Sequence, residues 1–463
     1  MSLRPATKRF LPSPRILTTS LNTTHHSPRH HKQSIRWSSV SQAPGSDRVH
    51  FPGAVNSKFT PTLSFTNPST LPAMPTYRTI DADGLLIDSS RPPISVPDDI
   101  VLKMYTDMLT VSILDPIMYQ AQRQGRLSFY MVSSGEEGIA VGSASALTAS
   151  DVVFAQYREA GVFQARGFSL DDFMNQLFAN RLDVGRGRNM PVHYGSKSLN
   201  MHTISSPLAT QIPQAAGAAY ALKLQHLQNP ESVERACVAC YFGEGAASEG
   251  DFHAALNMAA TRACPVVFVC RNNGYAISTP TLEQYRGDGI ASRGVGYGIH
   301  TIRVDGNDVF AVREVMQRAR ELALEGDMQP VLVEAMSYRV SHHSTSDDSS
   351  KYRPSGEVEA WKRRDNPITR LRKWMENKGL WSAEKEEQAQ KEIKNAVMAA
   401  FNKAEKEKRP ELRAMFEDVY EEVTEEQEEQ IEQLKDVIRR YPGEYDVEQF
   451  EGGLEGLDKA RSR

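Results

Sequence analysis

One stretch constrains the fold of this chain more than any other, because it has the pattern of a strand, a helix and a second strand in direct succession. It runs from Phe242 to Tyr275 and reads FGEGAASEGDFHAALNMAATRACPVVFVCRNNGY. The apolar run Ala236–Phe242 predicts the first strand, near-helical spacing predicts a helix over Phe252–Thr261, and Pro265–Cys270 predicts the second strand. Strands joined in this way are parallel, so the turns that follow them open at the same edge of the sheet.

The two turns carry oxygen ligands suited to a hard cation. Glu244 follows the first strand and Asn273 follows the second, so we expect them to lie side by side and to bind Mg²⁺. Gly243 and Gly245 let the backbone approach a ligand, and Gly245 leads toward a helix whose free N–H groups favour an anion. Either turn alone is better explained by ordinary turn chemistry than by a ligand site. The pair together indicates a metal-bound diphosphate.

The pairing of G-E-G with N-N-G-Y resembles the thiamine-diphosphate fold motif. The longer segments GEGAASEGD, CRNNGYAISTPT, YRGDGIA and GYGI are similar to those of the alpha subunits of mitochondrial branched-chain 2-oxo acid dehydrogenases. The similarity runs from about Phe51 to the C-terminus and is densest between Ser128 and Tyr352. Glu244 stands where the general motif has Asp, and Glu is what this subfamily uses. The resemblance implies oxidative decarboxylation of branched-chain 2-oxo acids such as 3-methyl-2-oxobutanoate, with transfer of the acyl group to a lipoyl-bearing acyltransferase, in branched-chain amino acid catabolism.

The resemblance also implies a set of site residues. The cofactors are thiamine diphosphate, Mg²⁺ and K⁺. The magnesium ligands are Glu244, Asn273 and the carbonyl of Tyr275. The potassium ligands are Ser205, Pro207 (through its carbonyl), Thr210 and Gln211. The residues that contact thiamine diphosphate are Tyr157, Arg158, Ser206, Leu208, Gly245, Ala246, Arg271, Arg339 and His343.

The segment YRVSHHSTSDDSSKYR carries the remaining functional positions. By resemblance, His343 faces the reactive end of the cofactor as the catalytic residue, since an imidazole can donate to a developing oxyanion. Ser344 matches the main phosphorylation position of the family. A phosphate there would repel Asp347 and its neighbour and disorder the loop. The second phosphorylation position corresponds to Pro354, so dual phosphorylation is not expected.

Candidates for contact with the substrate include two further residues, together with Leu208. His193 in MPVHYG is a candidate on the substrate side of the site. Leu208 and Phe129 are candidate apolar neighbours of a branched substrate side chain.

The N-terminal segment has the composition of a mitochondrial transit peptide. Residues 1–46 are rich in Ser and Arg and contain no acidic residue, because the first is Asp47. The formal net charge of the whole chain is −4, and removal of a basic leader makes the remainder more acidic. This balance argues against nucleic acid as a partner, and no apolar run is long enough to span a bilayer. We therefore expect a protein of the mitochondrial matrix.

The four cysteines lie within or beside the central unit. Cys237 and Cys240 form a CxxC pattern, but in a strand this spacing directs the two thiols to opposite faces. We therefore expect buried apolar thiols rather than a zinc site or a redox pair.

The alternation of strands and helices along the chain predicts an α/β fold with a doubly wound parallel sheet. Further helices are expected over Val101–Gln124, Glu136–Leu147, Pro207–Leu222 and Val309–Glu325. Further strands are expected over Thr301–Val304 and Val331–Met336, and another starts at Asp151–Phe154 and ends at Gln156-Tyr157-Arg158. The expected organisation is a transit peptide (1–46), an extended arm that packs on a neighbouring subunit (47–95), a thiamine-diphosphate-binding domain (96–360) and a helical C-terminal region (361–463). The acidic stretch Glu417–Glu432 is expected as a solvated helical face.

A chain of this size supplies only the diphosphate-binding half of a thiamine enzyme. The resemblance therefore implies a beta subunit in an α2β2 assembly, a lipoyl-bearing acyltransferase core, and a regulatory kinase and phosphatase. The alternatives are the alpha subunit of a pyruvate or acetoin dehydrogenase, a Rossmann oxidoreductase, and a non-catalytic scaffold. The sequence does not support the Rossmann oxidoreductase, because no GxGxxG motif with a ribose-binding acid follows the first strand.

Overall fold

The computed structural model describes residues 45, 47–51 and 54–458, and the chain divides into two compact units, Met1–Asn67 and Pro68–Arg463. In the first unit, β1 (Arg48–Phe51) and β2 (Ala54–Lys58) form an antiparallel pair. The transit peptide predicted over residues 1–46 lies outside the described residues apart from position 45, so it stays a prediction.

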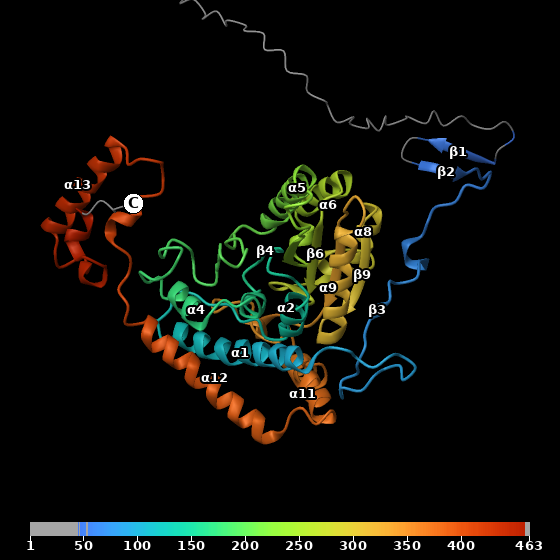
Figure 1. Ribbon diagram of the computed structural model, residues 1–463, viewed down its shortest axis with the longest axis horizontal. Helices are drawn as coiled ribbons and strands as arrows, with labels where there is room; N and C mark the ends of the chain where they lie inside the picture. The colour runs from blue at the N-terminus through green and yellow to red at the C-terminus, as the bar shows by residue number, and fades with distance from the viewer. Residues whose placement is uncertain (1–44, 46, 52–53, 459–463) are drawn as a thin grey trace, which may run out of the picture. The chain divides into compact units, whose positions relative to one another are not determined.

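A parallel sheet forms the centre of the second unit (Figure 1). Its six strands follow the spatial order β3-β9-β10-β6-β5-β4, and every neighbouring pair is parallel. The strands are β3 (Thr76–Tyr77), β4 (Val152–Phe154), β5 (Val238–Gly243), β6 (Val266–Asn272), β9 (His300–Asp305) and β10 (Val331–Met336). All carboxyl ends therefore lie along one edge, where open α/β sheets bind ligands. The predicted α/β class is confirmed.

The central strands are apolar on both sides because helices cover both faces of the sheet. Ala239 and Tyr241 of β5 belong to one core, whereas Cys240 and Phe242 belong to the other. Burying each large side chain stabilises the fold by roughly 1.5–3 kcal/mol. Cys237 and Cys240 lie in different cores, and all four cysteines are buried and unpaired, as predicted.

Helices form a layer on each side of the sheet (Figure 1). One face is covered by α5 (Gln211–Gln228), α6 (Gly250–Arg262) and α8 (Ala291–Gly296). The elements of the opposite face are α1 (Asp98–Arg123), α2 (Glu137–Ala144), α3 (Ala160–Ala165), α4 (Leu170–Leu177) and α9 (Val309–Leu324). A short pair, β7 (Tyr275–Ala276) and β8 (Thr279–Pro280), precedes α7 (Thr281–Gln284). None of the described helices is long and apolar enough to cross a membrane.

The helices after the last strand are α10 (Ser355–Arg364), α11 (Pro367–Asn377), α12 (Ala383–Ala404) and α13 (Glu425–Arg440). Leu371 and Trp374 of α11 share an apolar cluster with α1, and Phe401 of α12 packs in the core beside the sheet. The predicted C-terminal region is therefore continuous with the main core through α12, whereas the segment that includes α13 forms a separate apolar cluster around Leu412, Ile431, Ile438 and Leu457. The predicted domain boundaries themselves stay a prediction.

Two predicted helices begin well after the expected residue. The helix expected from Pro207 begins at Gln211, because the preceding turn contains Ala209 in the left-handed conformation (φ 65). The acidic stretch expected to be helical from Glu417 is helical only from Glu425, because Thr424 caps α13. The Thr424 side chain accepts a hydrogen bond from the backbone of Gln427, which fixes the first turn at that point.

Candidate active site at the carboxyl edge of the sheet

The turns after β5 and β6 bring the two predicted magnesium ligands together. The backbone N–H of Asn273 donates to Oε2 of Glu244 at 3.4 Å, and both residues are almost completely buried. Oε1 of Glu244 is buried and accepts no hydrogen bond. An unpaired buried carboxylate oxygen is energetically expensive. This oxygen is therefore positioned to bind a cation.

The chemistry around Glu244 fits a cation held largely by neutral oxygens. Burial and the charge of Glu136 raise the pKa of Glu244. Among the described residues, no three His, Cys, Asp or Glu side chains are grouped as metal ligands. A metal ion here would take further ligands from amide and carbonyl oxygens, such as those of Asn273 and Tyr275, and from a phosphate.

The turn that follows Glu244 leads toward a helix, as predicted. Ala246–Ser248 form a 3₁₀ turn, and α6 then begins at Gly250, slightly before the expected start at Phe252. A Cβ atom on Gly245 would lie 2.8 Å from the Cβ of Ala276. Glycine is therefore required for the turn to pack against β7.

Arg271 lies at the centre of a buried ion-pair network. Its guanidinium binds Glu136 and Glu159, and its Nη2 donates to Oε1 of Gln156 at 3.4 Å. Burial alone would lower the pKa of Arg271, but the two carboxylates raise it. Glu136 also accepts a hydrogen bond from Nδ2 of Asn273 at 2.7 Å, which fixes the orientation of that amide. Arg271 therefore holds Glu136, Glu159 and Gln156 in place, and most of its own N–H donors are already hydrogen-bonded.

Arg158 and Arg339 have the opposite character, because both are buried without a counter-ion among the described residues. Arg158 donates to the carbonyls of Val132 and His343, at 2.5 Å in each case. Arg339 donates to the carbonyl of Ile277 at 2.6 Å and to the hydroxyl of Tyr352 at 2.7 Å, and its Nε has no partner. Burial and the charge of Arg158 lower the pKa of Arg339. Two uncompensated buried cations indicate an anion-binding site.

The loop after β10 places His343 between these arginines and Tyr157. The rings of His343 and Tyr157 lie 6.0 Å apart in an edge-to-face arrangement. Burial and the charges of Arg158 and Arg339 lower the pKa of His343 to about 3. The imidazole is therefore neutral at physiological pH, with one ring nitrogen able to donate a hydrogen bond and the other able to accept one.

The same loop is closed by Asp347. Its carboxylate accepts a hydrogen bond from the backbone of His343 at 2.8 Å and another from the hydroxyl of Tyr352 at 2.7 Å. Ser344 is buried within this arrangement, and its Oγ accepts a hydrogen bond from the backbone of Ser346 at 3.2 Å. A charged group on Ser344 would have to displace the hydrogen bonds that order the loop.

The predicted potassium ligands lie in the turn that precedes α5, except for Gln211, which is the first residue of that helix. Gln211 donates its Nε2 to the carbonyl of Tyr241 at 2.9 Å, which leaves its amide oxygen available. Ser206 bonds through its hydroxyl to Nε2 of His193 at 2.8 Å, so His193 is tied to this turn. Leu208 is exposed, whereas Phe129 is half-buried against the core beside the sheet. The roles of these residues stay predictions.

Glu136 and Glu159 are important residues that the sequence interpretation missed. Each stood beside a noted feature, since Glu136 opens a predicted helix and Glu159 directly follows Arg158. An arginine that is buried at the end of a strand needs either an anionic ligand or a carboxylate partner. The position of Arg271 could therefore have directed attention to Glu136 and Glu159.

Comparison with known proteins identifies the family. A family model described as dehydrogenase E1 component matches residues 105–413, which is more than half of the chain. The chain belongs to the dehydrogenase E1 component family. The matched region includes every residue of the predicted site, from Tyr157 to Ser344. Membership of this family contradicts the alternatives of a Rossmann oxidoreductase and a non-catalytic scaffold.

Individual E1 relatives extend the similarity over most of the chain. The chain is 50% identical over 421 residues to the mitochondrial 2-oxoisovalerate dehydrogenase subunit alpha of Macaca fascicularis, which covers 91% of each protein. It is 51% identical over 405 residues to the protein of the same name from Mus musculus, covering 88% of this chain and 89% of that protein. The corresponding Caenorhabditis elegans protein is 53% identical over 360 residues, covering 78% and 81%.

Proposed function

We propose that this chain is the alpha subunit of a branched-chain 2-oxo acid dehydrogenase, the enzyme that oxidatively decarboxylates 2-oxo acids such as 3-methyl-2-oxobutanoate. The names of its relatives, at about half identity over most of the chain, support this assignment. The E1 family implies thiamine diphosphate as the cofactor.

The proposal rests on one observation: charged groups of both signs are buried without full compensation at one edge of the sheet. Arg158 and Arg339 are buried cations without a carboxylate partner among the described residues, and Glu244 has a buried oxygen without a donor. A diphosphate with its Mg²⁺ satisfies both at once, because the phosphate oxygens pair with guanidinium groups and the metal pairs with the carboxylate. The residues present therefore fit the cofactor.

The proposed binding residues follow from these contacts. Glu244, Asn273 and the Tyr275 carbonyl would hold Mg²⁺, while Arg158 and Arg339 would pair with the diphosphate. Tyr157, Ser206, Leu208 and the backbone of Gly245 and Ala246 complete the proposed cofactor contacts. Arg271 would act on the cofactor through Nη2, the nitrogen that binds Gln156 rather than Glu136 or Glu159. Bound thiamine diphosphate would supply the nucleophilic carbon and the electron sink for decarboxylation.

The protein's own groups would orient the substrate and control protons. His343 is neutral because burial and two arginines lower its pKa to about 3. A neutral imidazole would donate a hydrogen bond to a substrate oxygen without releasing a full charge into the site. Ser205, the Pro207 carbonyl, Thr210 and Gln211 would hold K⁺ and so fix the turn that carries Ser206.

The proposed assembly and regulation extend beyond this chain. A subunit named alpha implies a beta partner, and we propose that this partner completes the cofactor site in an α2β2 enzyme docked on a lipoyl-bearing acyltransferase core. The relatives are named mitochondrial, and for this chain we propose the matrix. A kinase and a phosphatase would act on Ser344, with Pro354 at the second position of the family.

The decisive experiment is reconstitution of the chain with its beta subunit, thiamine diphosphate and Mg²⁺. Turnover of 3-methyl-2-oxobutanoate should exceed turnover of pyruvate at equal concentration, and the chain alone should be inactive. A preference for pyruvate would favour the pyruvate or acetoin dehydrogenase alternative. Absence of turnover with every 2-oxo acid, in an assembled enzyme that binds the cofactor, would refute the proposed activity.

A further inference from the structure

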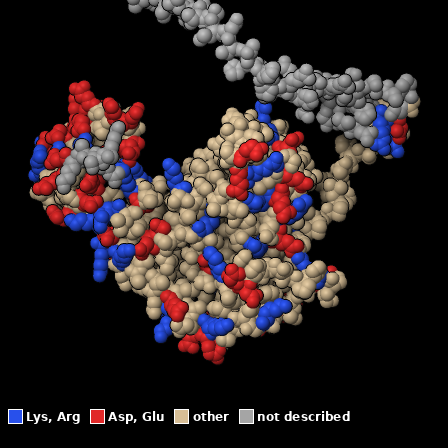
Figure 2. All heavy atoms as spheres, in the orientation of Figure 1, with Lys and Arg blue, Asp and Glu red and all other residues tan. Residues whose placement is uncertain are grey.

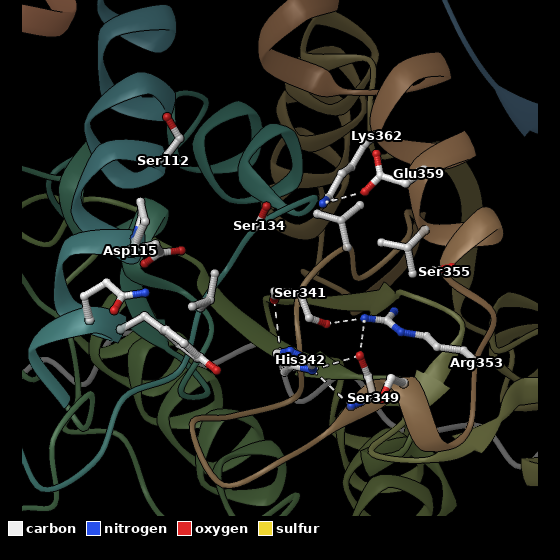
Figure 3. Close-up of a pocket in the computed structure, with 17 residues that line it drawn as sticks. Ser112, Asp115, Ser134, Ser341, His342, Ser349, Arg353, Ser355, Glu359 and Lys362 are labelled. Carbon is white, nitrogen blue, oxygen red and sulfur yellow. Dashed lines mark hydrogen bonds and ion pairs between the residues drawn. The ribbon is translucent and has the colours of Figure 1, made fainter. Parts of the chain in front are cut away.

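A cavity lies beside the loop that carries His343. It has a volume of about 520 Å³ and is lined by α1, residues 132–134, the loop after β10 and the start of α10 (Figure 3). The His342 side chain lines this cavity, whereas His343 packs beside Tyr157 and Arg158. Consecutive side chains of the loop therefore contact two different sites.

The cavity contains a buried positive charge that no carboxylate neutralises. Arg353 is buried, its Nε has no hydrogen-bond partner, and it forms no ion pair within the described part of the chain. Its other nitrogens donate to neutral acceptors, namely the carbonyls of Arg339 and Ser341 and the hydroxyl of Ser349. A buried guanidinium of this kind is suited to an anionic ligand.

The acidic groups of the cavity are already engaged. Glu359 binds Lys362 at 3.0 Å near the α10 side of the opening. Asp115 lies on the α1 wall, across the cavity from Arg353 (Figure 3). Its two oxygens accept hydrogen bonds from the hydroxyl of Tyr130 at 2.8 Å and from the backbone of Ser133 at 2.6 Å. The wall around Arg353 is therefore the side that would receive a negative group.

The rest of the lining is apolar or hydroxylic. Val132, Val340 and Val358 supply apolar surface, and beside Arg353 lie the carbonyl of Ser341 and the hydroxyl of Ser349. Volumes of this size accommodate small organic ligands rather than single ions. The lining therefore matches a ligand with one acidic group and a compact apolar body.

We propose that this cavity is a binding site for a small monocarboxylate with an apolar body, separate from the cofactor site and coupled to it through the loop 340–353. The carboxylate binds at Arg353, and the apolar body fills the space between α1 and α10. Such a ligand contacts His342 and Ser349, which are themselves joined by a 2.9 Å hydrogen bond. Its binding therefore ties the loop to two rigid helices and restricts the motion of His343 and Ser344.

Benzoate and its uncharged analogue benzamide are suitable probes, measured by calorimetry or ligand-observed magnetic resonance on the full chain assembled with its beta subunit. Benzoate should bind saturably and at least tenfold more tightly than benzamide. It should also slow hydrogen exchange of the backbone amides in residues 340–353. Equal affinity for the two probes, or no saturable benzoate binding, would overturn the proposal.

A matched pair of α10 variants locates the binding. Val358→Phe fills the cavity and should weaken benzoate binding at least tenfold, whereas Ala360→Phe places the same ring at an exposed position outside the lining and should leave it unchanged. Ser112→Leu fills the same space from α1 and should reproduce the loss if Val358→Phe disturbs folding. Undiminished benzoate binding in both filled variants would overturn the assignment to this cavity.

Discussion

Asn273 donates its backbone N–H to one carboxylate oxygen of Glu244, whereas the other oxygen of Glu244 is buried without any partner. The two residues come from the tips of adjacent parallel strands, β5 and β6. The polypeptide therefore uses one oxygen to fix the carboxylate and leaves the other for a ligand. The proposed magnesium site depends on this division.

Glu244→Ala should abolish binding of the Mg²⁺–cofactor complex without destabilising the free protein. Removal of a buried oxygen that has no partner relieves a desolvation cost, so the unfolding midpoint of the free chain should stay the same or rise. When the cofactor concentration is a hundred times its dissociation constant, cofactor binding should raise the unfolding free energy of the wild-type protein by about 2.7 kcal/mol. Thermal unfolding measures the first effect on the free chain, and the second on the chain assembled with its beta subunit, with and without thiamine diphosphate and Mg²⁺.

The control for this prediction is Glu249→Ala, which removes an exposed glutamate from the same segment. It should retain the full cofactor-induced shift. A Glu244→Ala protein that is stabilised by the cofactor as strongly as the wild type would show that Glu244 is not a metal ligand.

The buried arginines should separate into two classes. Arg158→Met removes a cation without a carboxylate partner, so its main effect should be a 10- to 100-fold weaker affinity for thiamine diphosphate, equivalent to about 1.5–3 kcal/mol. Arg271→Met leaves Glu136 and Glu159 buried without compensation and should cost about 3–5 kcal/mol of folding stability even without cofactor. Urea unfolding of the free chain and cofactor titration distinguish these outcomes.

If both variants lose stability equally in the absence of cofactor, Arg158 is structural and the anion site is misassigned. If Arg158→Met unfolds, Arg158→Lys keeps the charge but loses the forked geometry. That variant should fold normally and still bind the cofactor more weakly than the wild type.

The sequence predicted the parts of this site that are local to strand ends. Glu244 and Asn273 could be placed because each directly follows an apolar strand, and parallel strands end at the same edge. The strand Val331–Met336 was predicted to the residue, because its apolar run is bounded by polar turns. Family resemblance supplied Arg158, Arg339 and His343, which no spacing rule would connect.

The partners of these residues could not be predicted, because they come from distant segments. The pairing of Arg271 with Glu136 joins positions separated by 135 residues, and that with Glu159 joins positions separated by 112. Only the tertiary fold determines which arginine receives carboxylates and which stays unpaired. The same reasoning applies to Arg353, whose buried and unpaired state has no local signal.

A negative charge at Ser344 should disorder the active-site loop. Ser344 is buried beside Asp347, whose carboxylate orders the loop through His343 and Tyr352. Ser344→Glu should therefore speed hydrogen exchange in residues 340–353 and weaken cofactor binding. Exchange measured by mass spectrometry, together with cofactor titration, provides the readout.

Ser346→Glu is the matched control, because it adds the same charge two positions away on an exposed side chain. It should leave both quantities close to those of the wild type. Equal effects of the two variants would indicate a general response to charge rather than disruption of the Ser344 environment.

The buried Glu137 should make stability fall as the pH rises. Burial, aided by the charges of Asp115 and Glu136, raises its pKa from 4.5 to about 8. Between these values the folded state binds a proton that the unfolded state has released. This proton therefore stabilises the folded state most at low pH. As the pH rises between the two pKa values, the free energy of unfolding falls by up to about 1.4 kcal/mol per pH unit. His343 acts in the opposite direction, since its pKa is lowered to about 3 and its charging opposes folding below about pH 6.5.

Glu137→Gln removes the titrating carboxyl group and so isolates its contribution to the pH dependence of stability. The amide oxygen can still accept the 2.9 Å hydrogen bond from the backbone of Gly135. Urea unfolding at pH 5.5 and pH 7.5 should show the wild type losing more stability than the variant on going to the higher pH. Part of the slope should persist in the variant, since burial also raises the pKa of Asp115 to about 7. Parallel stability curves for the two proteins would mean that Glu137 titrates near its ordinary value, which would require water to reach the start of α2.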